Sequence, residues 1–180
     1  MNFIYYKGNQ KVDEPQPLKV LQVYDNHNDE IDKKILDFWV KEQALPSFEE
    51  EFIKERVSEV LYIILNDIDE IVGVSSGVSM YYHPIRNNFL YFRLFVQEKY
   101  RGNNQGVAIT LYYSSFDLFN ELKSFKSKEV VGLLIIYESE HLNKVINYYH
   151  SELYRNQFFL GFDDKMQQIR ISYFNGAKMF

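Results

Sequence analysis

The segment from Phe95 to Ala108 contains the residue types and spacing best suited to chemistry. It leaves an expected strand, passes through Arg101-Gly102-Asn103-Asn104-Gln105-Gly106 and enters an expected helix. Glycine and asparagine tolerate left-handed backbone and let a ligand come close. Successive N–H groups in such a loop, with the free N–H groups of the helix start, can cradle an anion, and Arg101 adds donors suited to phosphate. The segment therefore predicts an anion site; an ordinary strand-to-helix connection capped by asparagine is the alternative.

A second segment matches a catalytic pattern by its letters alone. Gly73, Ser75 and Gly77 fit G-x-S-x-G, the pattern of a serine nucleophile on a sharp strand-to-helix turn. Here the sequence continues as VSMYYHP, which is typical of a strand. We interpret these small residues as positions in a strand where another part of the chain passes close by.

Composition narrows the class of protein. The 180 residues are 46% hydrophobic, which fits one folded domain over residues 1–180. No cysteine is present, which excludes disulfides, thiolate metal sites and a cysteine nucleophile, and the four histidines show no metal-ligand spacing, so we expect no metal. A net charge of −5 disfavours nucleic-acid binding and weakly suits a cationic partner. No apolar run approaches the roughly 18 residues of a membrane span, and the start lacks a secretory signal, so we expect a cytoplasmic protein without a membrane partner.

Hydrophobic periodicity predicts a mixed α/β (α+β) sheet covered by helices. Expected strands are 18–24, 60–66, 71–82, 89–97, 130–137, 157–161 and 168–174. Expected helices begin near Ile31 and at Pro46-Ser47, where Ser47 and Glu50 form a capping box, and further helices cover about 104–122 and 141–150. In the helix 141–150, Tyr149 falls on the apolar stripe and should face the sheet. Edge strands near the C-terminus would be compatible with a homodimer.

At this point the residues resemble a known family. Val96 to Gly106 is similar to the acetyl-CoA loop of the GCN5-related N-acetyltransferases (GNAT family), which reads Arg/Gln-x-x-Gly-x-Gly/Ala after a strand ending in valine. Arg101 matches the first position and Gly106 the last, whereas Asn104 replaces a usual glycine. The hairpin around 70–73, the buried strand 130–137 followed by a helix ending in Tyr-Tyr, and the pair Gly161-Phe162 resemble the family as well, so the resemblance covers residues 18 to about 174.

The resemblance implies a sheet splayed between its fourth and fifth strands, with acetyl-CoA as cosubstrate in the gap. An amine would attack the thioester directly, and backbone N–H groups around Phe95 and Val96 would meet the oxyanion. Tyr149 is the implied proton donor to the departing thiolate, with Tyr148 as its fallback, and Glu138 is one candidate for the unresolved base. The residues implied in binding acetyl-CoA are Leu94, Phe95, Val96, Arg101, Gly102, Asn103, Asn104, Gln105, Gly106 and Val107.

These expectations leave alternatives open. The first function is N-acetyl transfer from acetyl-CoA to a primary amine, such as a small cationic amine, an amino acid or a peptide. The second is a non-catalytic acyl-CoA-binding or interaction domain, which the absence of an unambiguous base on the fourth strand favours. The third is a mixed α/β module that binds no cofactor. The sequence leaves the acceptor open, because loops and the first two helices shape acceptor pockets.

Overall fold

The computed structural model describes residues 17–102 and 106–178. Alternating apolar residues build one mixed sheet in the order β1-β2-β3-β4-β7-β10-β9-β8. Its strands are β1 (Lys19–Gln22), β2 (Val60–Leu65), β3 (Ile71–Tyr82), β4 (Asn87–Val96), β7 (Gly132–Tyr137), β8 (His150–Ser151), β9 (Gln157–Phe162) and β10 (Gln168–Tyr173). All neighbours pair antiparallel except β4 and β7, which are parallel. The short strands β5 (Ser124–Phe125) and β6 (Lys128–Glu129) form a separate hairpin.

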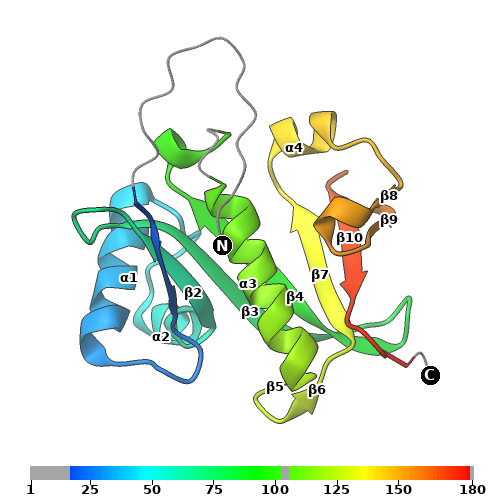
Figure 1. The fold of residues 1–180 in the computed structure, drawn as a ribbon, viewed down its shortest axis with the longest axis horizontal. Helices are drawn as coiled ribbons and strands as arrows, with labels where there is room; N and C mark the ends of the chain where they lie inside the picture. Colours follow the sequence, from blue (N-terminus) through cyan, green and yellow to red (C-terminus); the bar gives the residue numbers. More distant parts are fainter. Residues whose placement is uncertain (1–16, 103–105, 179–180) are drawn as a thin grey trace.

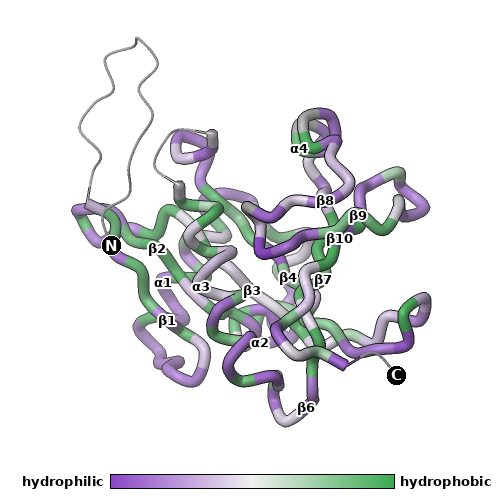
Figure 2. Tube along the Cα trace, turned by 45° about the vertical axis from the view of Figure 1, so that its right-hand side comes forward, coloured by the Kyte–Doolittle hydropathy of each residue, from purple (hydrophilic) through white to green (hydrophobic). Residues whose placement is uncertain are grey.

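Helices cover both faces of the sheet (Figure 1). The amphipathic α1 (Asp29–Glu42) buries Ile35, Phe38 and Trp39, and with α2 (Glu50–Ser58) it packs on one face of β2 and β3. The long α3 (Val107–Leu122) lies on the other face, where its apolar residues meet β2, β4 and β7. Figure 2 shows hydrophobic residues concentrated along the central strands, while hydrophilic residues gather on the turns. In β4, Leu90, Phe92 and Val96 pack toward α3, whereas Leu94 on the same face is 40% exposed.

Small residues in β3 permit the close approach of α3. A Cβ atom at Gly73 would lie 2.7 Å from Val107 Cγ1, and the hydroxyls of Ser75 and Ser115 are 3.0 Å apart in the core. The G-x-S-x-G letters therefore lie within one continuous strand, and the strand interpretation of this segment is confirmed.

Two expected helix ends were wrong. The helix predicted to start at Pro46-Ser47 starts at Glu50 instead, with Glu49 at its N-cap. Ser47 accepts a hydrogen bond from the Glu49 N–H at 3.3 Å, so its hydroxyl forms a local turn rather than a capping box with Glu50. The helix predicted over 141–150 is the six-residue α4 (Glu140–Val145).

The early end of α4 has a clear cause in β10. The Gln168 side-chain amide donates to the carbonyl oxygens of Asn143 and Ile146 at 3.0 and 2.7 Å, and Arg170 Nη2 donates to the Tyr148 carbonyl at 2.7 Å. The N–H of Phe159 in β9 donates a hydrogen bond to the Tyr149 carbonyl oxygen at 2.8 Å. These carbonyls are bonded to the sheet, so they cannot continue a helical ladder.

Candidate functional site

The sheet opens between β4 and β7. The pairs between these two strands end at Leu90 with Leu133 and Tyr91 with Leu134, although β4 continues to Val96 and β7 to Tyr137. In Figure 1 the two strands diverge from these pairs toward the end of the sheet where α3 begins. The splay expected between the fourth and fifth strands of the sheet, counted along the chain from β1, is therefore present between β4 and β7.

Backbone hydrogen bonds show which peptide groups of β4 face this gap. Gln97 N–H donates to the Val72 carbonyl on the β3 side, and Val131 N–H, just before β7, donates to the Asn88 carbonyl, each at 2.9 Å. Because successive peptide groups along a strand point to opposite neighbours, those of even-numbered residues in β4 point toward β7. The peptide groups of Leu94 and Val96 therefore face the gap, beyond the last pair with β7.

The same alternation corrects one expected donor. Phe95 pairs with Val74 of β3, so its N–H points toward β3 and not to the position expected for an oxyanion. Its ring packs edge-on against Phe38 of α1, with centroids 5.8 Å apart. Val96 remains the backbone donor expected at this position.

The loop after β4 leads to the start of α3. A short 3₁₀ turn, η1 (Glu98–Tyr100), buries Tyr100 beside Val96 and Val107, which anchors the loop to the core. Gly102 and Gly106 have φ values of 65° and 66°, the left-handed backbone that favours glycine. Asn103, Asn104 and Gln105 lie outside the described residues.

The start of α3 is suited to an anion. Gly106 is its N-cap, and its first turn contains no acidic side chain, whereas α1 and α2 each begin with several. Acidic side chains in the first turn would compete for the positive end of the helix dipole. In α3 the first N–H groups have no such competitor. The Val107 side chain is buried in the core, so this residue can offer a ligand only its backbone.

Arg101 connects the loop to β4. Its Nε donates to the Val96 carbonyl oxygen at 2.6 Å, and its guanidinium lies 5.0 Å from the centre of the Phe95 ring. The side chain is otherwise exposed at the end of the gap. Its terminal nitrogens are therefore well placed for phosphate oxygens.

Tyr149 does not lie where the helical pattern placed it. It follows α4, and 72% of its surface is exposed, so the prediction that its ring faces the sheet was wrong. Tyr148 is more enclosed: its ring lies 4.7 Å from the Arg170 guanidinium and stacks on Tyr154. Burial raises the pKa of Tyr148, with a further increase from Tyr154. The choice of proton donor between these tyrosines stays a prediction.

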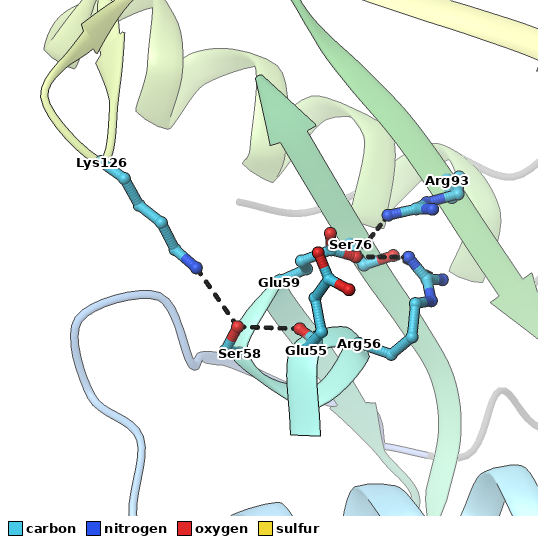
Figure 3. Close-up of polar contacts among 7 residues, drawn as sticks. All are labelled: Glu55, Arg56, Ser58, Glu59, Ser76, Arg93 and Lys126. Carbon is cyan, nitrogen blue, oxygen red and sulfur yellow. Dashed lines mark hydrogen bonds and ion pairs between the residues drawn. The ribbon is translucent and has the colours of Figure 1, made fainter. Parts of the chain in front are cut away.

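Sequence reasoning missed a buried polar cluster beside β4. Glu59, at the end of α2, accepts hydrogen bonds at Oε2 from Arg56 Nη1 and Arg93 Nη2, each at 2.5 Å (Figure 3). Arg93 stands opposite Ser76 on β3, and Arg56 Nη2 lies 3.4 Å from the Ser76 hydroxyl. An arginine and a glutamate three apart at a helix end are common on surfaces, so nothing in the local pattern indicates that this pair is buried.

A pocket of about 690 Å³ opens elsewhere, lined by α1, α2 and the segment that follows β1. Its lining includes Asp32 of α1, which pairs with His27 at 2.8 Å, and Lys126 of the turn between β5 and β6. None of its lining residues comes from β4 or α3, so it is separate from the gap.

The geometry defines a class of fold: a mostly antiparallel sheet, splayed at one parallel pair, with a glycine-containing loop leading from the splay into a helix. This is the fold of the GCN5-related N-acetyltransferases, and solved structures share it. A ribosomal-protein-S5-alanine acetyltransferase from Vibrio fischeri matches with a TM-score of 0.60 and 11% identity, over 89% of this chain and 95% of that one. The GNAT-family YhbS from Escherichia coli, crystallised with CoA, matches with a TM-score of 0.56 and 14% identity, over 94% and 91%.

A longer protein from Enterococcus faecalis, described as a probable N-acyltransferase, matches with a TM-score of 0.50 and 14% identity. The match covers 72% of this chain and 31% of that protein. In sequence, no protein-family profile and no curated protein matches the chain. Among the described residues, no helix has both the length and the apolar character needed to cross a membrane.

Proposed function

We propose that this protein transfers an acetyl group from acetyl-CoA to a primary amine. The observation that carries the proposal is the course of β4, which leaves its partner β7 after Tyr91 and continues to Val96. Peptide groups of Leu94 and Val96 then face the gap, and the chain runs directly into the loop and the N-terminus of α3. This arrangement offers extended hydrogen bonding to an amide-containing arm and an anion site at one end, which are the two features of CoA.

The residues at the end of β4, in the loop and at the start of α3 each have a role in the proposed binding. The pantetheine arm pairs with the peptide groups of Leu94 and Val96, and the pyrophosphate lies on backbone N–H groups of Gly102, Gly106 and Val107. The charge on Arg101 supports that end of the site. The left-handed glycines, Gly102 and Gly106, leave the backbone accessible because no Cβ stands in the way.

The reaction follows from this placement. The neutral amine nitrogen attacks the thioester carbonyl carbon, a C–N bond forms, and the carbonyl oxygen becomes an oxyanion that the Val96 N–H stabilises. When the intermediate collapses, the C–S bond breaks and the thiolate takes a proton. The amine loses its extra proton to a base or to water. Tyr149, with Tyr148 as the alternative, is the proposed donor to the thiolate, and this assignment rests on the resemblance.

A second candidate function is acyl-CoA binding without catalysis. It is favoured by the contacts of Glu59, a buried carboxylate that bonds to Arg93 of β4, because two arginines already occupy its Oε2 atom. Glu138, exposed just after β7, is the remaining candidate base.

Two measurements together test the proposal and separate it from the alternative. Calorimetric titration with acetyl-CoA should give saturable binding at about micromolar concentrations, which corresponds to roughly −8 kcal/mol. Release of free thiol from acetyl-CoA should then depend on an added amine. Binding without amine-dependent release would favour the non-catalytic function, and absence of binding would contradict both.

A further inference from the structure

The polar cluster formed by Arg56, Glu59 and Arg93 has more positive than negative charge. Both arginines bond to the same Oε2 atom of Glu59, whose side chain is 6% exposed (Figure 3). Among the described ion pairs, no second carboxylate reaches either arginine. Burial lowers the pKa of Arg56, and the neighbouring charge of Arg93 lowers it further. The cluster therefore has a net charge of about +1 in a partly desolvated position, where a further anion would be stabilised.

Arg93 has donors left for such an anion. Its hydrogen bond to Glu59 uses Nη2, and its guanidinium lies 5.1 Å from the centre of the Tyr91 ring, while Nε is buried and has no hydrogen-bond partner in the described part of the chain. The side chain is 27% exposed, against 12% for Arg56, so Arg93 is the member of the cluster that reaches solvent. A guanidinium with one edge held and another unsatisfied is suited to binding a carboxylate.

The position of Arg93 relates this charge to the gap. Arg93 shares a face of β4 with Tyr91, and the next residue, Leu94, directs its peptide groups toward β7. On this face α1 and α2 pack against β2 and β3, whereas α3 lies on the opposite face. A molecule bound at Arg93 would therefore approach the gap from the side opposite α3.

Glu138, exposed just after β7, is a carboxylate whose charge acts on Tyr91. Burial raises the pKa of Tyr91 most, the charges of Glu138 and Asp163 raise it further, and the charges of Arg93 and Arg56 lower it. The Tyr91 phenol thus lies within electrostatic range of both the arginines and Glu138.

We propose that the acceptor is an amine that also carries a carboxylate, as an amino acid does, with the carboxylate on Arg93 and the amine directed to the gap beside Leu94. This inference rests on the proposed acetyl transfer and names the acceptor's chemical class. The carboxylate is not consumed: the C–N bond forms at the amine, the C–S bond breaks, and Arg93 fixes the acceptor's orientation. Arg93 is a substrate-binding residue, and Glu59 with Arg56 positions its guanidinium.

The test compares matched acceptors. Thiol release is measured for a panel of α-amino acids and β-alanine, each beside its own carboxamide, with acetyl-CoA held constant. The amide's amine is less basic and more of it is neutral, so chemistry alone favours the amide. We expect the best acid to exceed its amide in kcat/KM by about tenfold or more, mainly through KM.

Variants then locate the effect. Arg93→Gln should lower kcat/KM for the acid by about tenfold and leave the amide within about twofold, because only the acid uses the guanidinium. Arg93→Lys should recover part of the loss, since it keeps the charge without the planar fork. Arg155→Gln is the matched control, because Arg155 forms an exposed pair with Asp117 of α3. This variant should leave kcat/KM unchanged for both the acid and the amide. If Arg93→Gln does not fold, the acid-over-amide preference of the unmodified protein decides the matter.

The outcomes separate this inference from the proposed function. Saturable acetyl-CoA binding with equal use of acids and amides, or with no reaction across the panel, would overturn the carboxylate assignment alone. An equal loss for acid and amide in Arg93→Gln would overturn it too. Failure to bind acetyl-CoA at all would overturn the proposed function and this inference with it.

Discussion

Arg101 Nε lies 2.6 Å from the carbonyl oxygen of Val96, so the arginine predicted to bind phosphate also bonds to the end of β4. This contact fixes the guanidinium at the point where the gap meets the loop. It also satisfies a carbonyl oxygen that lies beyond the last pairing with β7. Cofactor binding and the local order of β4 are therefore expected to depend on the same side chain.

Arg101→Ala should weaken acetyl-CoA binding by about tenfold, because a charge-assisted contact to phosphate is lost. The free energy of unfolding should change by less than about 1 kcal/mol, since the side chain is exposed and water can replace it at Val96. Calorimetry and thermal unfolding measure the two effects. Lys128→Ala, an exposed cation on β6, is the control and should change neither. Unchanged acetyl-CoA affinity in Arg101→Ala would contradict the role of the loop.

Gly106 allows backbone strain and cofactor contact to be separated. Its φ of 66° disfavours a side chain, and a Cβ there would lie 3.4 Å from Ile109 Cγ2. Gly106→Val should lower both the melting temperature and the affinity for acetyl-CoA. The strained backbone should reduce the free energy of unfolding by about 1–2 kcal/mol. Gly106→Asn tolerates the left-handed backbone, so stability should largely return while binding stays weak. Normal binding in both variants would remove Gly106 from the phosphate site.

Tyr149→Phe and Tyr148→Phe identify the proton donor. General-acid help is typically worth about 10²–10⁴-fold in rate, so loss of the donor hydroxyl should reduce turnover at least tenfold. Because Tyr149 is largely exposed, its variant should leave the melting temperature and acetyl-CoA affinity unchanged. Turnover of each variant under saturating acetyl-CoA is the measurement. A drop confined to Tyr148→Phe would transfer the role to Tyr148, and a drop in neither would assign the proton to water.

The fold could be predicted further than the site. Strands of alternating apolar residues, such as β3 and β4, and the amphipathic α1 appeared at nearly their expected positions, because burial of one face determines the period. The end of α4 could not be predicted, because it depends on Gln168 and Arg170, which lie more than twenty residues later in the chain. The same separation explains the misplaced ring of Tyr149.

The acceptor side was also beyond the sequence. Glu59 and Arg93 are 34 positions apart, and their contact depends on how the end of α2 meets β4. The loop at Arg101, by contrast, is formed by residues adjacent in the chain, and glycine is the residue type that permits its left-handed backbone at Gly102 and Gly106.

Stability should depend on Tyr137 at high pH. Burial raises the pKa of Tyr137 to about 12, against an ordinary value of 10.0, and its hydroxyl donates to Gln157 Oε1 at 2.9 Å. The folded state holds this proton more tightly than the unfolded state does. The contribution of Tyr137 to the free energy of unfolding is therefore complete below pH 10 and is lost as pH rises through 12. The loss should be of the order of 2 kcal/mol. Urea unfolding at several pH values should show that the free energy of unfolding declines less steeply with rising pH in Tyr137→Phe than in the unmodified protein. The same pH dependence in both proteins would contradict this assignment.

Amine-dependent release of free thiol from acetyl-CoA tests the central claim most directly. The account predicts that the protein releases thiol in proportion to acetylated amine when an acceptor is present, and that Arg101→Ala needs more acetyl-CoA to reach the same rate. Thiol release no faster than in the absence of protein, across amines, amino acids and peptides at saturating acetyl-CoA, would contradict it.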